Sequence, residues 1–157
     1  MNLRSLTNLL EANLREELAA KTEVLRLIEA QEEAAARSDM DAFEAGLESM
    51  KAHLAADRRR ETKRAKVMQR LGETWGVAAD ALTLGSVAIR LGADGEVLSG
   101  LRTELKARVE ELAQRNRRLS AVLGMHRRLN QDVMNVVFGA EGGADPTEAG
   151  SLVDARA

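Results

Sequence analysis

The first 37 residues contain no glycine and no proline, and large aliphatic side chains recur among them at helical spacing. The members of this repeat lie three, four or seven residues apart: Leu3, Leu6, Leu10, Leu14, Leu18, Leu25 and Ile28. This spacing places them on one face of an α-helix and leaves the intervening glutamates on the other face. Such a helix, about 50 Å long at 1.5 Å per residue, must pack against another element. We therefore expect a long first helix over residues 3–37.

The composition extends this expectation to the whole chain. Hydrophobic residues make up 45% of the 157 residues and charged residues 31%, but aromatic residues only 2%. Alanine and leucine supply most of the apolar content, which is typical of long helices and coiled coils. A core without aromatic anchors is thin, which disfavours a compact enzyme. The absence of cysteine excludes disulfides, thiolate metal sites and a thiol nucleophile. We expect an all-α, non-enzymatic protein without a cofactor.

Three further helices follow from the pattern. A second helix over residues 39–71 begins after Ser38 and Asp39, which are good N-terminal caps. Its apolar seam has heptad spacing and consists of Met40, Phe43, Leu47, Met50 and Leu54. Glycine-rich sequence brackets a short helix over residues 77–91, and a last long helix spans residues 96–138.

The connections between these helices indicate the architecture. A short turn makes the first two helices an antiparallel hairpin. We expect an elongated, coiled-coil-like bundle of three long helices with a short helical connector, forming a single domain over residues 1–139. Residues 140–157 contain several glycines and the only proline and are predicted to be a flexible acidic tail.

Charge is unevenly distributed along the chain. Residues 1–50 contain 5 basic and 11 acidic side chains, whereas residues 57–70 contain 7 basic and 2 acidic ones and residues 102–128 contain 8 basic and 3 acidic ones. If the acidic first segment lies antiparallel to one or both basic segments, it is expected to attract them across the bundle. Where the seam of the second helix is continued, it meets Asp57, Glu61 and Arg64, which predicts a polar, weak stretch of the core.

The remaining chemical signals have ordinary explanations. His53 and His126 lack a second ligand at metal-binding spacing, which disfavours a metal site. The cluster Arg58–Arg60 fans around its helix and has no aromatic neighbour for base stacking, which disfavours nucleic acid binding. No stretch resembles a signal peptide or a membrane span, so we expect a cytoplasmic protein without membrane insertion.

The order of these features resembles the FlgN-type flagellar export chaperones over most of residues 3–143. The motifs that carry the resemblance are Leu82-Thr83-Leu84-Gly85, Ile89-Arg90-Leu91-Gly92, Arg115-Asn116-Arg117-Arg118-Leu119, Leu129-Asn130 and Phe138-Gly139-Ala140-Glu141-Gly142. Family members often carry a Tyr-Gly turn after the last helix, where this chain has Phe138. The chain contains no tyrosine, so a role that needs a tyrosine hydroxyl is not expected here.

The resemblance implies a chaperone that binds the terminal helices of hook-associated proteins, prevents their premature assembly and delivers them to the flagellar type III export gate. It places the client site on the last helix, at Leu112, Asn116, Leu119, Leu123, His126, Leu129, Asn130, Val133 and Val137, and a contact with the export gate at Phe138. The free protein is expected to be a monomer or a weak homo-oligomer. The alternative hypothesis is a coiled-coil adaptor that oligomerises without a secretion role.

Overall fold

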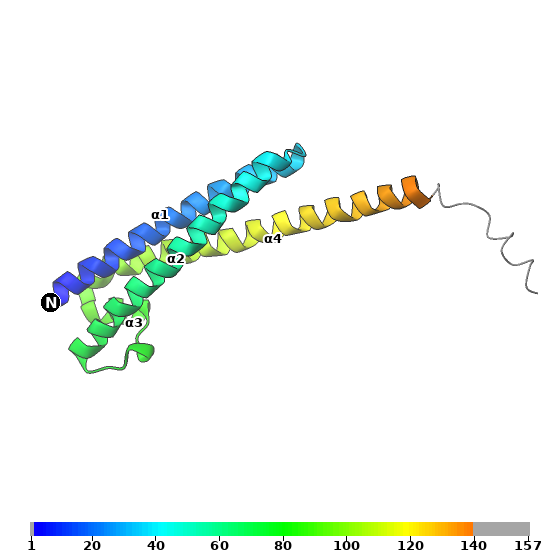
Figure 1. Cartoon of the computed structure of the whole chain (residues 1–157). Coiled ribbons are helices and arrows are strands. Elements are labelled where there is room, and N and C mark those ends of the chain that lie inside the picture. Colours follow the sequence, from blue (N-terminus) through cyan, green and yellow to red (C-terminus); the bar gives the residue numbers. More distant parts are fainter. Residues whose placement is uncertain (1, 140–157) are drawn as a thin grey trace, which may run out of the picture. The chain divides into compact units, whose positions relative to one another are not determined.

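The computed structural model describes residues 2–139, with side chains up to residue 136. Three long helices, α1 (Leu3–Ala36), α2 (Met40–Trp75) and α4 (Glu96–Gly139), dominate it (Figure 1). A connector of η1 (Ala79–Ala81), α3 (Leu84–Leu91) and η2 (Gly92–Gly95) joins α2 to α4. The described residues contain no strand, which confirms the predicted all-α fold. The predicted tail, residues 140–157, lies outside the described residues.

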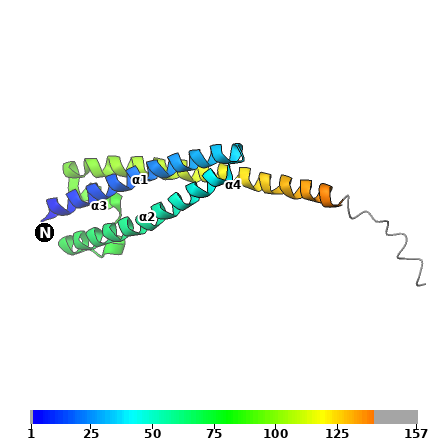
Figure 2. The same ribbon diagram turned by 45° about the horizontal axis from the view of Figure 1, so that its top comes forward.

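Packing divides the described residues into two units, the first ending at Leu119 and the second beginning at Ser120. In the first unit, α1 and α2 form an antiparallel hairpin and the first half of α4 lies beside them (Figure 2). Leu98 shares one apolar cluster with Leu6, and Leu119 shares another with Ile28, so α4 runs parallel to α1. The second unit contributes the helical residues 120–139. The single domain predicted over residues 1–139 stays a prediction.

The helix ends follow local rules that the sequence already contains. The turn after α1 passes through Ser38 at φ 57°, and the Asp39 carboxylate accepts a hydrogen bond of 3.1 Å from the backbone N–H of Ala42. The predicted cap at Asp39 is therefore present. At the end of α2, Gly76 adopts a left-handed conformation, and Val77 N–H donates to the Gly72 carbonyl at 2.9 Å. This Schellman arrangement extends α2 four residues beyond its predicted end.

The connector differs from the single short helix that the sequence predicts over residues 77–91. The structure divides it into η1 and α3 because Thr83 caps α3 with a reciprocal Thr83–Ser86 capping box. The connector then turns at Gly95, where a Cβ atom would lie 2.0 Å from the carbonyl oxygen of Ala88. Only glycine fits this close approach of η2 to α3.

Two apolar clusters hold the first unit together. The larger one lies where α1 begins, α2 ends and α3 and α4 meet; its buried members are Leu6, Leu10, Leu14, Leu71, Leu82, Val87, Ala88 and Leu98. The smaller one lies at the hairpin turn; its buried members are Ile28, Ala34, Ala35, Phe43 and Leu119. Neither cluster contains a side chain from residues 51–66 of α2, so the polar stretch predicted at Asp57, Glu61 and Arg64 lies between them.

The seam of α2 corrects the predicted one. Phe43 is buried and Met50 is half-buried in the smaller cluster, but Met40, Leu47 and Leu54 are exposed. The position that alternates with Phe43 and Met50 on the side of α2 facing α1 is Gly46, one residue earlier than the predicted Leu47. A Cβ atom at Gly46 would lie 2.9 Å from Cγ of Gln31, so α1 approaches α2 at a position that only a small residue tolerates. The buried Gln31 amide then donates to the Phe43 carbonyl at 3.4 Å.

Candidate functional site

The side chains predicted to bind a client fall into two environments. Leu112 and Leu119 pack in the smaller cluster of the first unit, where Leu119 is only 5% exposed. Asn116 belongs to the same unit and is exposed. The predicted contacts in the second unit are Leu123, His126, Leu129, Asn130 and Val133. Val137 and Phe138 lie in helical backbone, but their side chains are outside the described ones. The structure therefore separates Leu112 and Leu119 from the residues after Ser120.

An ion pair supports the packing of Leu119 against the hairpin. Arg115, one turn before Leu119, reaches Glu29 at 2.9 Å and Glu32 at 3.3 Å, both on α1. This contact joins the basic segment of α4 to the acidic first segment, although α4 runs parallel to α1 and the attraction was expected between antiparallel segments. Leu119 itself contributes to the core with Ile28 and Phe43. Leu119 therefore helps to hold α4 against the hairpin.

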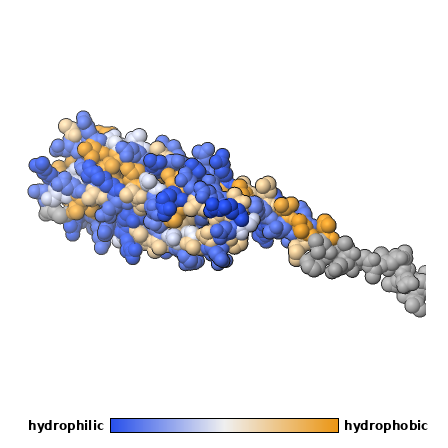
Figure 3. Space-filling view, turned by 90° about the horizontal axis from the view of Figure 1, so that it is seen from above, coloured by the Kyte–Doolittle hydropathy of each residue, from blue (hydrophilic) through white to orange (hydrophobic). Residues whose placement is uncertain are grey.

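Residues 120–136 form an amphipathic helix with an uncovered apolar side. The exposed large apolar side chains of this segment are Leu123, Met125, Leu129, Val133, Met134 and Val136. At 100° per residue they occupy an arc of about 180°, and we call this surface the apolar face. The opposite side carries Arg127, Arg128, Gln131, Asp132 and Asn135. In Figure 3, hydrophobic side chains are visible on the helical segment adjoining the grey atoms.

The apolar face and the predicted client set overlap only in part, at Leu123, Leu129 and Val133. Met125, Met134 and Val136 belong to it but were not among the predicted contacts. Helical spacing could have identified Met125, because Met125 and Leu129 are four residues apart, as are Leu129 and Val133, and residues at this spacing share a helix face. Methionine side chains are flexible and polarizable, and they adapt to partners of different shape.

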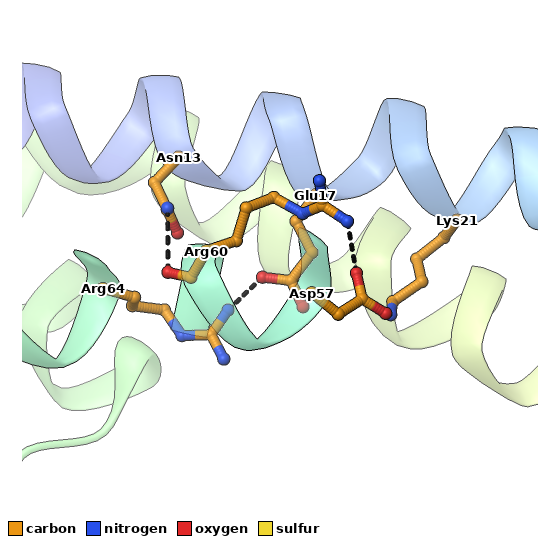
Figure 4. A network of polar contacts seen from close by, with 6 residues as sticks. All are labelled: Asn13, Glu17, Lys21, Asp57, Arg60 and Arg64. Atoms are coloured by element: carbon orange, nitrogen blue, oxygen red, sulfur yellow. Dashed lines mark hydrogen bonds and ion pairs between the residues drawn. The ribbon is translucent and has the colours of Figure 1, made fainter. Parts of the chain in front are cut away.

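Figure 4 shows a polar network between α1 and α2. It lies in the middle of the hairpin, between the two apolar clusters. Lys21 pairs with Asp57 at 2.5 Å, Arg60 pairs with Asp57, and Arg64 pairs with Glu17. The Asn13 amide donates to the Arg60 carbonyl at 3.1 Å. The network links α1 to α2 at the positions where the apolar seam is interrupted.

The electrostatics of Asp57 reflect this environment. Burial alone would raise the pKa of Asp57, but hydrogen bonds from Lys21 and Arg60 outweigh burial, and the pKa lies below its ordinary value. Asp57 is therefore ionised at neutral pH. The Asn13 side-chain oxygen and Nε of Arg60 have no hydrogen-bond partner within the described structure. The network thus fixes the helix pairing at some cost in unpaired polar groups.

The described part of the chain offers neither a metal-binding cluster nor a membrane-spanning helix. Within residues 2–139, no group of three or more histidine or acidic side chains is placed to hold a metal ion. No helix among these residues is both long and apolar enough to cross a membrane.

Comparison with known proteins identifies the family. The model of the FlgN protein family matches residues 1–147, which include every helix described above. Searches of curated proteins and of solved structures found no match. The chain therefore belongs to the FlgN family, a family of flagellar export chaperones and not of enzymes.

Proposed function

We propose that this chaperone binds the terminal helices of hook-associated proteins, keeps them from assembling prematurely in the cytoplasm, and delivers them to the flagellar type III export gate. Family membership supports the export role in general, and the resemblance described above supplies the client. The observation that carries the proposal is the apolar face of α4, which has six exposed large hydrophobic side chains within residues 123–136.

The chemistry of the apolar face suits a temporary helix binder. Burying apolar area stabilises a complex by roughly 25 cal/mol per Å² before the costs of association are subtracted. An amphipathic client helix would lay its apolar side against Leu129 and Val133 and cover them. Asn130 lies within the arc of this surface and is expected to set the register of the client helix through hydrogen bonds. Such binding needs no ATP.

The decisive experiment introduces charge into the apolar face. The double variant Leu129→Asp with Val133→Asp changes two exposed residues, so the fold is expected to survive. We expect affinity for the terminal helices of a hook-junction protein, measured by isothermal titration calorimetry, to fall by about 100-fold, because two charges would be buried without partners.

The matched control introduces the same charge on the opposite side of the same helix. Gln131→Asp with Asn135→Asp changes two exposed polar residues, and we expect affinity to change less than about threefold. Circular dichroism of both variants must match the parent chain. Equal binding by both variants, or equal loss in both, would contradict the assignment of the client site to the apolar face.

Delivery to the export gate requires a separate test. The resemblance assigns this contact to Phe138, at the position where relatives often carry tyrosine. We expect Phe138→Ala to reduce client secretion in cells while leaving client affinity within about twofold. If Phe138→Ala instead loses client affinity together with secretion, Phe138 belongs to the client site and not to the contact with the export gate.

A further inference from the structure

The outward surface of α2 carries a continuous row of exposed side chains that no contact described so far explains. Each member follows the previous one by three or four residues, and the row averages about 3.6 residues per step, so it stays on one side of a straight helix. Its members are Asp41, Glu44, Glu48, Ala52, Ala55, Arg59, Lys63, Lys66 and Arg70, all exposed. We call this row the α2 stripe.

The α2 stripe is divided by charge. Its first third is acidic, its centre consists of the small residues Ala52 and Ala55, and its last part is basic. Within the described structure, the only ion pair that engages a member of the stripe is the bond of 2.5 Å between Lys51 and Glu48. The helix dipole favours acidic residues only in the first turn and basic residues only in the last. It therefore does not account for Glu48 or for Arg59, which lie well inside the helix.

We infer that the α2 stripe is the contact surface for a second copy of this chain. Two copies of α2 packed antiparallel about a two-fold axis near Ala55 would place the acidic third of each copy against the basic part of the other. In this arrangement Asp41 faces Arg70, Glu44 faces Lys66, and Glu48 faces Lys63, and the two-fold axis repeats these three pairs. The central alanines allow the two helices to approach closely. Such an isologous contact closes on itself and gives a dimer instead of a filament.

A groove beside the basic part of the stripe provides apolar contact. The groove has a volume of about 290 Å³, and the stripe residues Lys63, Lys66 and Arg70 line one wall. Leu9, which is 47% exposed, and Val67 supply apolar surface to it. The acidic third of the second copy presents the small side chain of Ala45 between Asp41 and Glu48, which suits a shallow groove with a basic wall.

The self-complementary pattern favours a second copy over a different partner. A partner of uniform charge, such as a nucleic acid or an acidic peptide, would match only the basic part of the stripe and would be repelled by the acidic third. Lys51 and Glu73 lie beside the stripe and have the opposite charge to the stripe residues nearest to them. Each already has a partner within α2, because Lys51 pairs with Glu48 and Glu73 accepts a hydrogen bond from the Gln69 amide. This inference does not depend on the client site proposed above.

Charge reversal and recombination test the inference directly. At tens of micromolar and 50 mM NaCl, we expect sedimentation equilibrium of the full chain to show a dimer that weakens by about tenfold or more in 500 mM NaCl, since exposed ion pairs are screened. Glu44→Lys with Glu48→Lys, and separately Lys63→Glu with Lys66→Glu, are expected to be monomeric because like charges then face each other. An equimolar mixture of the two variants restores every pair and is expected to form a heterodimer.

A matched control reverses two acidic residues elsewhere in the first unit. Asp80→Lys with Glu104→Lys changes exposed residues away from the stripe and is expected to leave the dimer intact. A parent chain that stays monomeric in 50 mM NaCl would overturn the inference. So would a dimer that persists in either reversal variant, because association would then use another surface such as the apolar face. Failure of the mixture to associate would overturn it as well.

A second measurement uses the absence of cysteine from the chain. Ala55→Cys places a single thiol near the proposed two-fold axis, and we expect it to form a disulfide-linked dimer on mild oxidation. Ala81→Cys, an exposed residue of η1, serves as the control and is expected to cross-link at least tenfold more slowly. Equal rates for the two variants would show that the copies meet only by random collision.

Discussion

Leu119 offers the sharpest test of how α4 is held. Leu119→Ala removes three carbons from a side chain that is 5% exposed. At about 0.8 kcal/mol per carbon, the lost transfer free energy is about 2.4 kcal/mol. The cavity left between Ile28 and Phe43 adds to this cost, so we expect the free energy of unfolding to fall by about 3 kcal/mol.

Urea denaturation followed by circular dichroism at 222 nm measures this change. With an m value of about 2 kcal/mol/M, the midpoint is expected to fall by about 1.5 M. Leu129→Ala is the control of identical chemistry at a residue that is 60% exposed, and its expected change is within about 0.5 kcal/mol. A fall of less than about 1 kcal/mol for Leu119→Ala would refute the conclusion that this side chain fastens α4 to the hairpin.

Two further predictions concern backbone packing and pH. Gly95→Ala forces a Cβ atom against the Ala88 carbonyl and should lower thermal stability by several degrees. Gly100→Ala, inside α4 one turn from its start, meets no atom within 4 Å and should raise thermal stability slightly. Because the folded pKa of Asp57 lies below its ordinary value, its contribution is complete above about pH 5 and is lost as pH falls through that lowered pKa. The difference in unfolding free energy between the parent chain and Asp57→Asn should therefore shrink below about pH 4 in urea titrations.

Much of the fold could be predicted because the local signals agree with the packing. The leucine repeat of α1 predicts the buried face correctly at Leu6, Leu10, Leu14 and Ile28. The polar turn before α2 predicts the cap at Asp39. These features depend on residues that are near one another in the sequence, where periodicity and capping are informative.

The register of α2 could not be predicted in the same way. Leu47 and Leu54 fit the apolar heptad pattern of α2 better than Gly46 and His53 do. In the structure, however, α1 packs against the side of α2 that carries Gly46 and His53. Which face of α2 packs against α1 depends on the close approach of Gln31 to Gly46 and on the ion pairs of the polar network. These contacts join residues far apart in the sequence. A hydrophobicity pattern contains no information about such pairs.

The client site shows a related limit of sequence reasoning. The apolar repeat of α4 continues from Leu112 to Val136 with the same spacing, so periodicity identifies one face throughout. Periodicity does not say what covers that face. In the structure Leu119 is buried against Ile28 and Phe43, while Leu129 and Val133 are exposed. The predicted set therefore combines residues that build the core with residues that are available to a partner.

The polar network explains why a bundle with so thin a core keeps one register. Sliding α2 along α1 by a single turn would still bring leucines together, since both helices carry apolar side chains at each end. It would also separate Asp57 from Lys21 and Glu17 from Arg64 and leave these groups partly buried without partners. Breaking such pairs costs far more than forming them gains. The network thus excludes alternative pairings that leucine contacts alone would allow, and it does so without using the side chains of the apolar face, which are exposed.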